Sequence, residues 1–139
     1  MEAKIKYKSF NTDKTIEELK YNLINQREVL RNLIIEHEFY KKLLNAPIYK
    51  SQKRNLFEIL EGFKVELKKT VANNQILLNE IGMQLFQIDK KVECDDLLCD
   101  NFFIKEIDDL EFRIHHFHLE NSALKSRMFE YLQHVIIDQ

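Results

Sequence analysis

The stretch FIKEIDDLEFRIHHFHLENSALKSRMFEYLQHV, residues 103–135, decides the fold. Apolar side chains recur in it every three or four residues, the spacing that places them on one face of an α-helix. The positions on this face are Phe103, Ile107, Leu110, Ile114, Phe117, Asn121, Leu124, Met128, Tyr131 and Val135. We therefore predict a long amphipathic helix over about 97–137, capped by Asp96 or Asp100.

Two earlier stretches repeat this pattern and predict helices over about 13–45 and 51–92. The first has core positions Ile16, Leu19, Leu23, Gln26, Leu30, Leu33, His37, Tyr40 and Leu44. The second has Leu56, Leu60, Phe63, Leu67, Thr70, Asn74, Leu77, Ile81, Leu85, Ile88 and Val92. Thr12 or Asp13 is the expected N-cap of the first helix. Pro47 ends it, because the residue before a proline is driven out of the α region.

The composition agrees with an all-α fold. The chain has 139 residues but only two Gly and one Pro, too few for the many tight turns of sandwiches, barrels and doubly wound folds. We predict one domain over 13–139, an up-down-up bundle of three long antiparallel helices with coiled-coil-like packing. Residues 1–12 are expected to form a flexible arm. The alternative is a splayed set of helices whose core closes only in a dimer.

Four core positions are polar, and we predict that they form a layer near the middle of the bundle. In two antiparallel helices joined by a short connection, residues that lie side by side have numbers with a constant sum. This sum is about 95 for the first and second helices and about 195 for the second and third. Gln26 is then level with Thr70, and Asn74 is level with Asn121. Buried polar groups need hydrogen-bond partners, so such a layer specifies the register of the helices. A ligand or metal pocket is the alternative.

Several apolar side chains fall outside the predicted core face. Phe112, His116 and Leu119 repeat at helical spacing on the third helix, and Ile35 and Phe39 lie off the core face of the first. Contiguous apolar side chains on a surface indicate a contact with another molecule. We predict a self-association or partner surface here. The alternative is that the buried face of each helix is wider than the core positions imply.

Basic residues are concentrated at one end of the predicted bundle. Five basic residues and no acid lie between positions 41 and 54: Lys41, Lys42, Lys50, Lys53 and Arg54. Such a basic tip is usually only solvated, and it is also a candidate site for an acidic partner or for phosphate. The formal net charge of −2 argues against general affinity for nucleic acid or anionic membranes.

No residues are arranged as a catalytic, cofactor-binding or metal-binding motif. Cys94 and Cys99 are expected to be ordinary reduced thiols, with a metal site or a redox pair as alternatives. A helical di-iron core needs Glu-x-x-His, which does not occur. His115, His116 and His118 have no obvious nucleophile or carboxylate to work with.

Together these features predict a non-enzymatic protein–protein interaction or scaffold module, homodimeric or bound to another protein. Nucleic-acid or phosphate binding through the basic tip is the alternative. We expect no cofactor, no membrane span and no small-molecule substrate. Because the first ten residues lack the apolar run of a secretory signal, a cytoplasmic location is expected.

Overall fold

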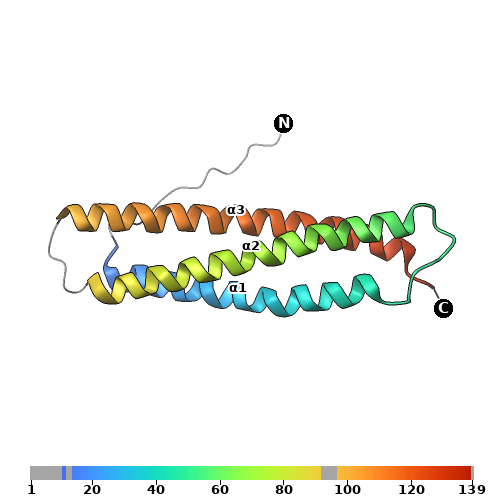
Figure 1. Ribbon diagram of the computed structural model, residues 1–139, viewed down its shortest axis with the longest axis horizontal. Helices are drawn as coiled ribbons and strands as arrows, with labels where there is room; N and C mark the ends of the chain where they lie inside the picture. Colours follow the sequence, from blue (N-terminus) through green and yellow to red (C-terminus); the bar gives the residue numbers. More distant parts are fainter. Residues whose placement is uncertain (1–10, 12–13, 92–96, 139) are drawn as a thin grey trace, which may run out of the picture.

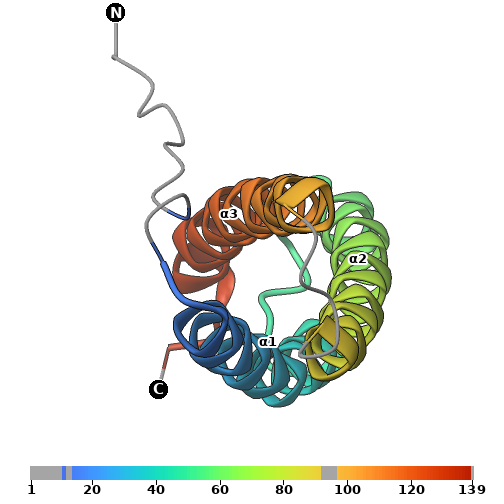
Figure 2. The same ribbon diagram turned by 90° about the vertical axis from the view of Figure 1, so that its left-hand side faces the viewer.

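The computed structural model describes residues 11, 14–91 and 97–138. Three helices make up almost all of it: α1 (Ile16–Asn45), α2 (Leu56–Lys91) and α3 (Leu97–Val135). They lie side by side along one long axis, α2 running antiparallel to α1 and α3 (Figure 1). Viewed end-on, the helices surround a common centre (Figure 2). The prediction of an all-α three-helix bundle is therefore confirmed.

The start of α1 differs from the prediction by about three residues. Thr15 is the N-cap, and its hydroxyl accepts a hydrogen bond from the Glu18 backbone N–H at 3.1 Å. The Glu18 carboxylate accepts in return from the Thr15 backbone N–H at 3.4 Å. This reciprocal capping box satisfies two N–H groups that a helix start leaves unpaired, which explains why the helix begins at Ile16. The proposed caps, Thr12 and Asp13, lie outside the described residues.

The connection between α1 and α2 is longer than predicted, because α2 begins at Leu56 and not near Ser51. Asn55 adopts a left-handed conformation with φ of 62°, which a helix interior does not allow. Ala46 is extended before Pro47, so the predicted end of α1 is correct. The third predicted helix ends early, at Val135, because the chain beyond it pairs with this connection. Tyr49 and Ile136 form an isolated antiparallel bridge.

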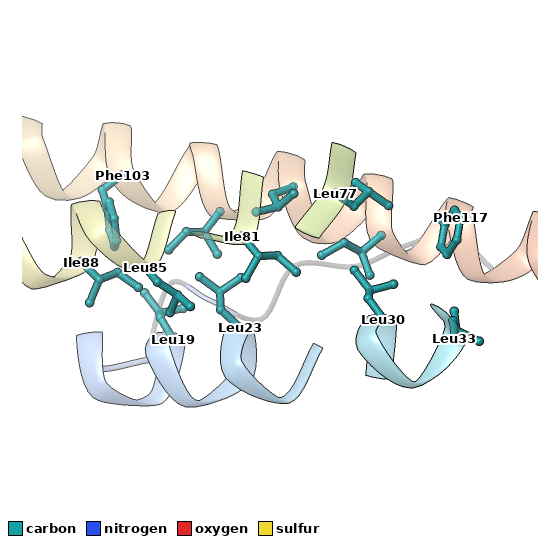
Figure 3. Close-up of a cluster of buried hydrophobic side chains, with 13 residues drawn as sticks. Leu19, Leu23, Leu30, Leu33, Leu77, Ile81, Leu85, Ile88, Phe103 and Phe117 are labelled. Carbon is teal, nitrogen blue, oxygen red and sulfur yellow. The ribbon is translucent and has the colours of Figure 1, made fainter. Parts of the chain in front are cut away.

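The core closes within one chain, in two apolar clusters that each take side chains from all three helices. The long cluster comprises Leu19, Leu23, Leu30, Leu33, Leu77, Ile81, Leu85, Ile88, Phe103, Ile107, Leu110, Ile114 and Phe117. Figure 3 shows Leu23 and Ile81 facing each other within it. The short cluster comprises Tyr40, Leu44, Phe63, Leu67, Leu124, Met128, Leu132 and Val135. Most of the apolar core positions predicted from the helical period are buried, and Leu132 is an addition to them. Ile16, Leu56, Leu60 and Tyr131 are only partly buried, and Val92 lies outside the described residues.

A polar layer separates the two clusters, with one buried side chain from each helix: His37, Asn74 and Asn121. His37 Nε2 lies 2.8 Å from Asn121 Oδ1, and Asn74 Nδ2 donates to the Leu30 carbonyl at 3.0 Å. Asn74 and Asn121 were predicted members of this layer. His37 was predicted as a core position but not as a member of the layer.

Gln26 and Thr70 do not belong to the polar layer, contrary to the prediction. Gln26 contacts His118 on α3, and the Thr70 hydroxyl donates to the Glu66 carbonyl of its own helix at 3.0 Å. The error arises from the register of α1 against α2. Asn74 lies beside Leu30, and these two residue numbers sum to 104 and not to about 95. The sum is larger because ten residues, 46–55, connect α1 and α2, which moves α2 along α1. The register of α2 against α3 is close to the prediction, since Glu66 pairs with Arg127.

Candidate functional site

The outward face of α3 carries the apolar group that the sequence singled out. Phe112 is 42% exposed and Leu119 is 54% exposed, and His116 is exposed between them. The rings of Phe112 and His116 meet edge to face with centroids 4.6 Å apart. These side chains lie opposite the core, so the alternative of a wider buried face does not explain them.

The two predicted residues on α1 form a separate group. Ile35 is 69% exposed and Phe39 is 58% exposed. Phe39 contacts Tyr40 on its own helix, and Tyr40 contacts Phe129 of α3 with ring centroids 5.5 Å apart. This aromatic group lies at the end of the bundle that holds the short cluster. The structure therefore places the α1 group and the α3 group on different helices and does not join them into one patch.

Sequence reasoning missed a third apolar group, on the outward face of α2. Val65, Ile76, Met83 and Phe86 are each more than half exposed. They fall on a second heptad repeat, which a count of off-core apolar positions on α2 would have found. The Lys90 ammonium lies over the Phe86 ring, 4.5 Å from its centroid. This contact covers part of one ring and leaves the rest of the group exposed.

The basic tip is partly tied into the fold. The Lys50 ammonium pairs with the Asp138 carboxylate at 3.2 Å, and the Lys50 backbone N–H donates to the Val135 carbonyl at 2.8 Å. The other four predicted residues, Lys41, Lys42, Lys53 and Arg54, are exposed. The predicted helix over about 51–92 would have held Lys53 and Arg54 in its first turn. They precede α2 instead, because that helix starts at Leu56.

A cavity of about 590 Å³ lies between α1 and α2 beside the polar layer. Its lining residues are Ile34, His37, Glu38, Lys41, Asn45, Lys64, Leu67, Lys68, Val71, Asn74 and Gln75. Two buried side chains in this lining have a polar atom without a hydrogen-bond partner, namely His37 Nδ1 and Asn74 Oδ1. Leaving such an atom unpaired costs about 1–3 kcal/mol. The sequence predicted neither the cavity nor these unpaired atoms.

A second, more polar cavity of about 400 Å³ lies between α1 and α3. His115, His118 and Glu111 line it from α3, together with amide side chains of α1. His118 is half-buried and lies 3.4 Å from Gln26 Oε1. Burial and the neighbouring His115 lower the pKa of His118, so its imidazole stays neutral to lower pH than a free histidine.

Metal binding has no support among the described side chains. Within residues 11, 14–90 and 102–138, no three His, Cys, Asp or Glu side chains are arranged to hold a metal ion. Cys94 lies outside the described residues, and Cys99 lies in α3 at a position whose side chain is not described. The alternatives for the two cysteines therefore stay predictions.

Among the described helices, none combines the length and the hydropathy that crossing a membrane requires. Comparison with known proteins adds no relative: no family model matches this chain, and no curated protein or solved structure matches it significantly. The function must therefore be argued from the geometry of the bundle alone.

Proposed function

We propose that this protein is a non-enzymatic interaction module that self-associates through the outward face of α3. The observation that carries the proposal is the exposed Phe112–His116 ring pair beside Leu119. Neither apolar core cluster includes Phe112, His116 or Leu119. Large apolar side chains kept contiguous on a surface are typical of a contact with another molecule.

The same face has the pattern of an antiparallel, two-fold contact between identical helices. Its exposed heptad positions are Lys105, Asp109, Phe112, His116, Leu119, Ala123, Ser126 and Glu130. Antiparallel pairing about a two-fold axis between His116 and Leu119 brings Phe112 of one chain against Ala123 of the other. It also brings Lys105 against Glu130. A large side chain then meets a small one, and a cation meets an anion.

The area available supports a weak dimer. Phe112 and Leu119 from two chains are four large side chains, and burying each contributes about 1.5–3 kcal/mol. Association costs at least about 4 kcal/mol in lost translational and rotational freedom. Only the upper end of this balance, about 8 kcal/mol, corresponds to a micromolar dissociation constant, so the proposal requires a contact that buries these side chains almost completely.

Sedimentation equilibrium of a double variant, Phe112→Lys with Leu119→Lys, tests the proposal. We expect the natural chain to form dimers at about 100 μM, and we expect the double variant to sediment as a monomer with unchanged far-UV helicity. The matched control is Ile76→Lys with Met83→Lys, which places the same charges on the outward face of α2. A monomeric natural chain would contradict the proposal, and a dimer lost only in the control would assign the contact to α2.

Anion binding at the basic tip is the second proposal, favoured by the exposure of Lys41, Lys42, Lys53 and Arg54. The fifth residue, Lys50, already pairs with Asp138, which lowers the charge available to a ligand. Binding of generic duplex DNA through so few charges would be weak and would fall steeply with salt. A salt titration of DNA binding distinguishes this proposal, because the self-association module needs no binding at physiological salt.

A further inference from the structure

The cavity between α1 and α2 has a built interior. Its floor consists of His37, Leu67 and Asn74, which are 3%, 4% and 1% exposed. Ile34 and Val71 form apolar walls closer to the surface. A volume of about 590 Å³ lies within the range of small-molecule sites, which are mostly apolar with a few placed polar groups.

The floor holds two polar side-chain atoms that the protein leaves unpaired. Because a carbonyl oxygen can only accept, His37 Nε2 donates to Asn121 Oδ1. The other ring nitrogen, Nδ1, has no hydrogen-bond partner. Asn74 donates through Nδ2 to the Leu30 carbonyl, and its Oδ1 has no partner either. Hydrogen bonds to Asn121 and to the Leu30 carbonyl thus fix the orientation of both side chains, and their unpaired atoms are buried beneath the cavity.

The rim of the cavity is positive. Lys41, Lys64 and Lys68 line it, against the single carboxylate of Glu38. Lys64 pairs with Glu61 at 2.8 Å, whereas Lys41 and Lys68 form no ion pair within the described residues. Two ammonium groups, one from each helix, therefore border the opening. Their charge favours an anionic group held at the mouth.

We propose that this cavity binds a small amphiphilic carboxylate, with its apolar chain against Ile34, Leu67 and Val71 and its carboxylate between Lys41 and Lys68. Two parts of the site favour this class of ligand: the apolar walls of a cavity of limited volume and the cationic rim. The site lies between α1 and α2, away from the outward face of α3, so it does not depend on self-association.

Titration of the full chain with sodium decanoate below its micellar concentration tests the site. Isothermal calorimetry measures affinity, and methyl NMR of Ile34, Leu67 and Val71 locates the ligand. We expect saturable one-to-one binding with shifts at these methyl groups. Decyltrimethylammonium has the same chain with a cationic head, and we expect it to bind at least tenfold more weakly. Equal binding of the two probes, or shifts confined to other surfaces, would overturn the proposal.

Two double variants test whether decanoate binding depends on the lysines of the rim or on positive charge in general. Lys41→Gln with Lys68→Gln should weaken decanoate binding at least tenfold, whereas Lys42→Gln with Lys69→Gln, the adjacent exposed lysines outside the cavity, should leave it unchanged. A third variant, Val71→Phe, fills the cavity from a partly exposed wall and should abolish binding while retaining helicity. If both lysine variants bind decanoate alike, the assignment of the rim is wrong. If Val71→Phe binds as well as the natural chain, the cavity is not the site.

Discussion

The two apolar clusters differ in how the chain closes them. The long cluster has thirteen buried residues, almost all aliphatic, that come from helical segments alone. The short cluster has eight, and six partly buried side chains surround it, including Tyr49 from the connection between α1 and α2. Among the described residues, helices alone therefore complete the long cluster. The short cluster also includes non-helical chain, through Tyr49.

This difference predicts unequal responses to the loss of the same atoms. The cost of a cavity depends on how far its surroundings can collapse into it. Around the long cluster the described neighbours all lie in helices, and four of them, Ile16, Ile24, Leu78 and Ile104, are partly buried. Around the short cluster, partly exposed side chains can move inward.

A matched pair of leucines gives the largest expected effect. Leu110 is 1% exposed in the long cluster, and Leu132 is 2% exposed in the short cluster. We expect Leu110→Ala to lower the free energy of unfolding by about 3–5 kcal/mol and Leu132→Ala to lower it by about 2–3 kcal/mol. Urea denaturation followed by circular dichroism measures both. Equal losses, or a larger loss at Leu132, would show that the two clusters do not differ in their capacity to relax.

The polar layer between the clusters should respond in a different way. Asn121→Ala removes the acceptor of the His37 Nε2 proton, and we expect a loss of about 1–3 kcal/mol because a buried donor is left unpaired. Replacing both groups, His37→Leu with Asn121→Leu, should be close to neutral or stabilising, since neither partner of this hydrogen bond is then left unpaired.

Denaturation of both variants tests this expectation, with Asn73→Ala, an exposed amide next to Asn74, as the control. The control should change stability by no more than about 0.5 kcal/mol. A double variant as unstable as Asn121→Ala would mean that the layer contributes packing and not hydrogen bonding.

The smallest effect concerns pH, and it has opposite directions at the two clusters. His118 adjoins Phe117 of the long cluster, and burial together with His115 lowers its pKa. The unfolded chain therefore binds the His118 proton more tightly than the folded chain does. The contribution of His118 to the free energy of unfolding is fully present above pH about 6.5 and is lost as the pH drops below it. Tyr40 of the short cluster has its pKa raised to about 12 by burial and by Glu36. Its contribution is complete below pH about 10 and is lost as the pH rises from there toward 12.

Unfolding measured at acidic, neutral and alkaline pH separates the two responses. His118→Gln should reduce the acid loss alone, and Tyr40→Phe should reduce the alkaline loss alone. His134→Gln, an exposed histidine at the end of α3, should leave both unchanged. If His118→Gln changed the alkaline loss, or if Tyr40→Phe changed the acid loss, the assignment of that loss to the residue would be wrong.

Much of this architecture could be predicted from the helical period. Leu23, Ile81 and Ile107 are fully buried where the period places them, because an amphipathic helix turns its apolar face toward the core. The register of α1 against α2 could not be predicted in the same way. It depends on where α2 begins, and the left-handed conformation of Asn55 delays that start.

The candidate surfaces show a similar division. The outward position of Phe112 and Leu119 follows from helical geometry, and the structure places both at the surface. The cavity beside Asn74 could not be predicted, because its volume depends on the distance between α1 and α2. The unpaired atom on Asn74 could not be predicted either, since the partner of its amide is a backbone carbonyl set by the register.

The bridge between Tyr49 and Ile136 has a kinetic consequence. It joins residues 87 positions apart, whereas most hydrogen bonds of the helices join residues four apart. Loop-closure entropy rises with the logarithm of the length enclosed, so contacts of this span form slowly compared with helical turns. Helices can form within microseconds, but the short cluster stays incomplete until this distant pair has met. We therefore expect closure of the short cluster to be limited by contacts of this span, which include the bridge and the Lys50–Val135 and Ile137–Ile48 backbone hydrogen bonds beside it.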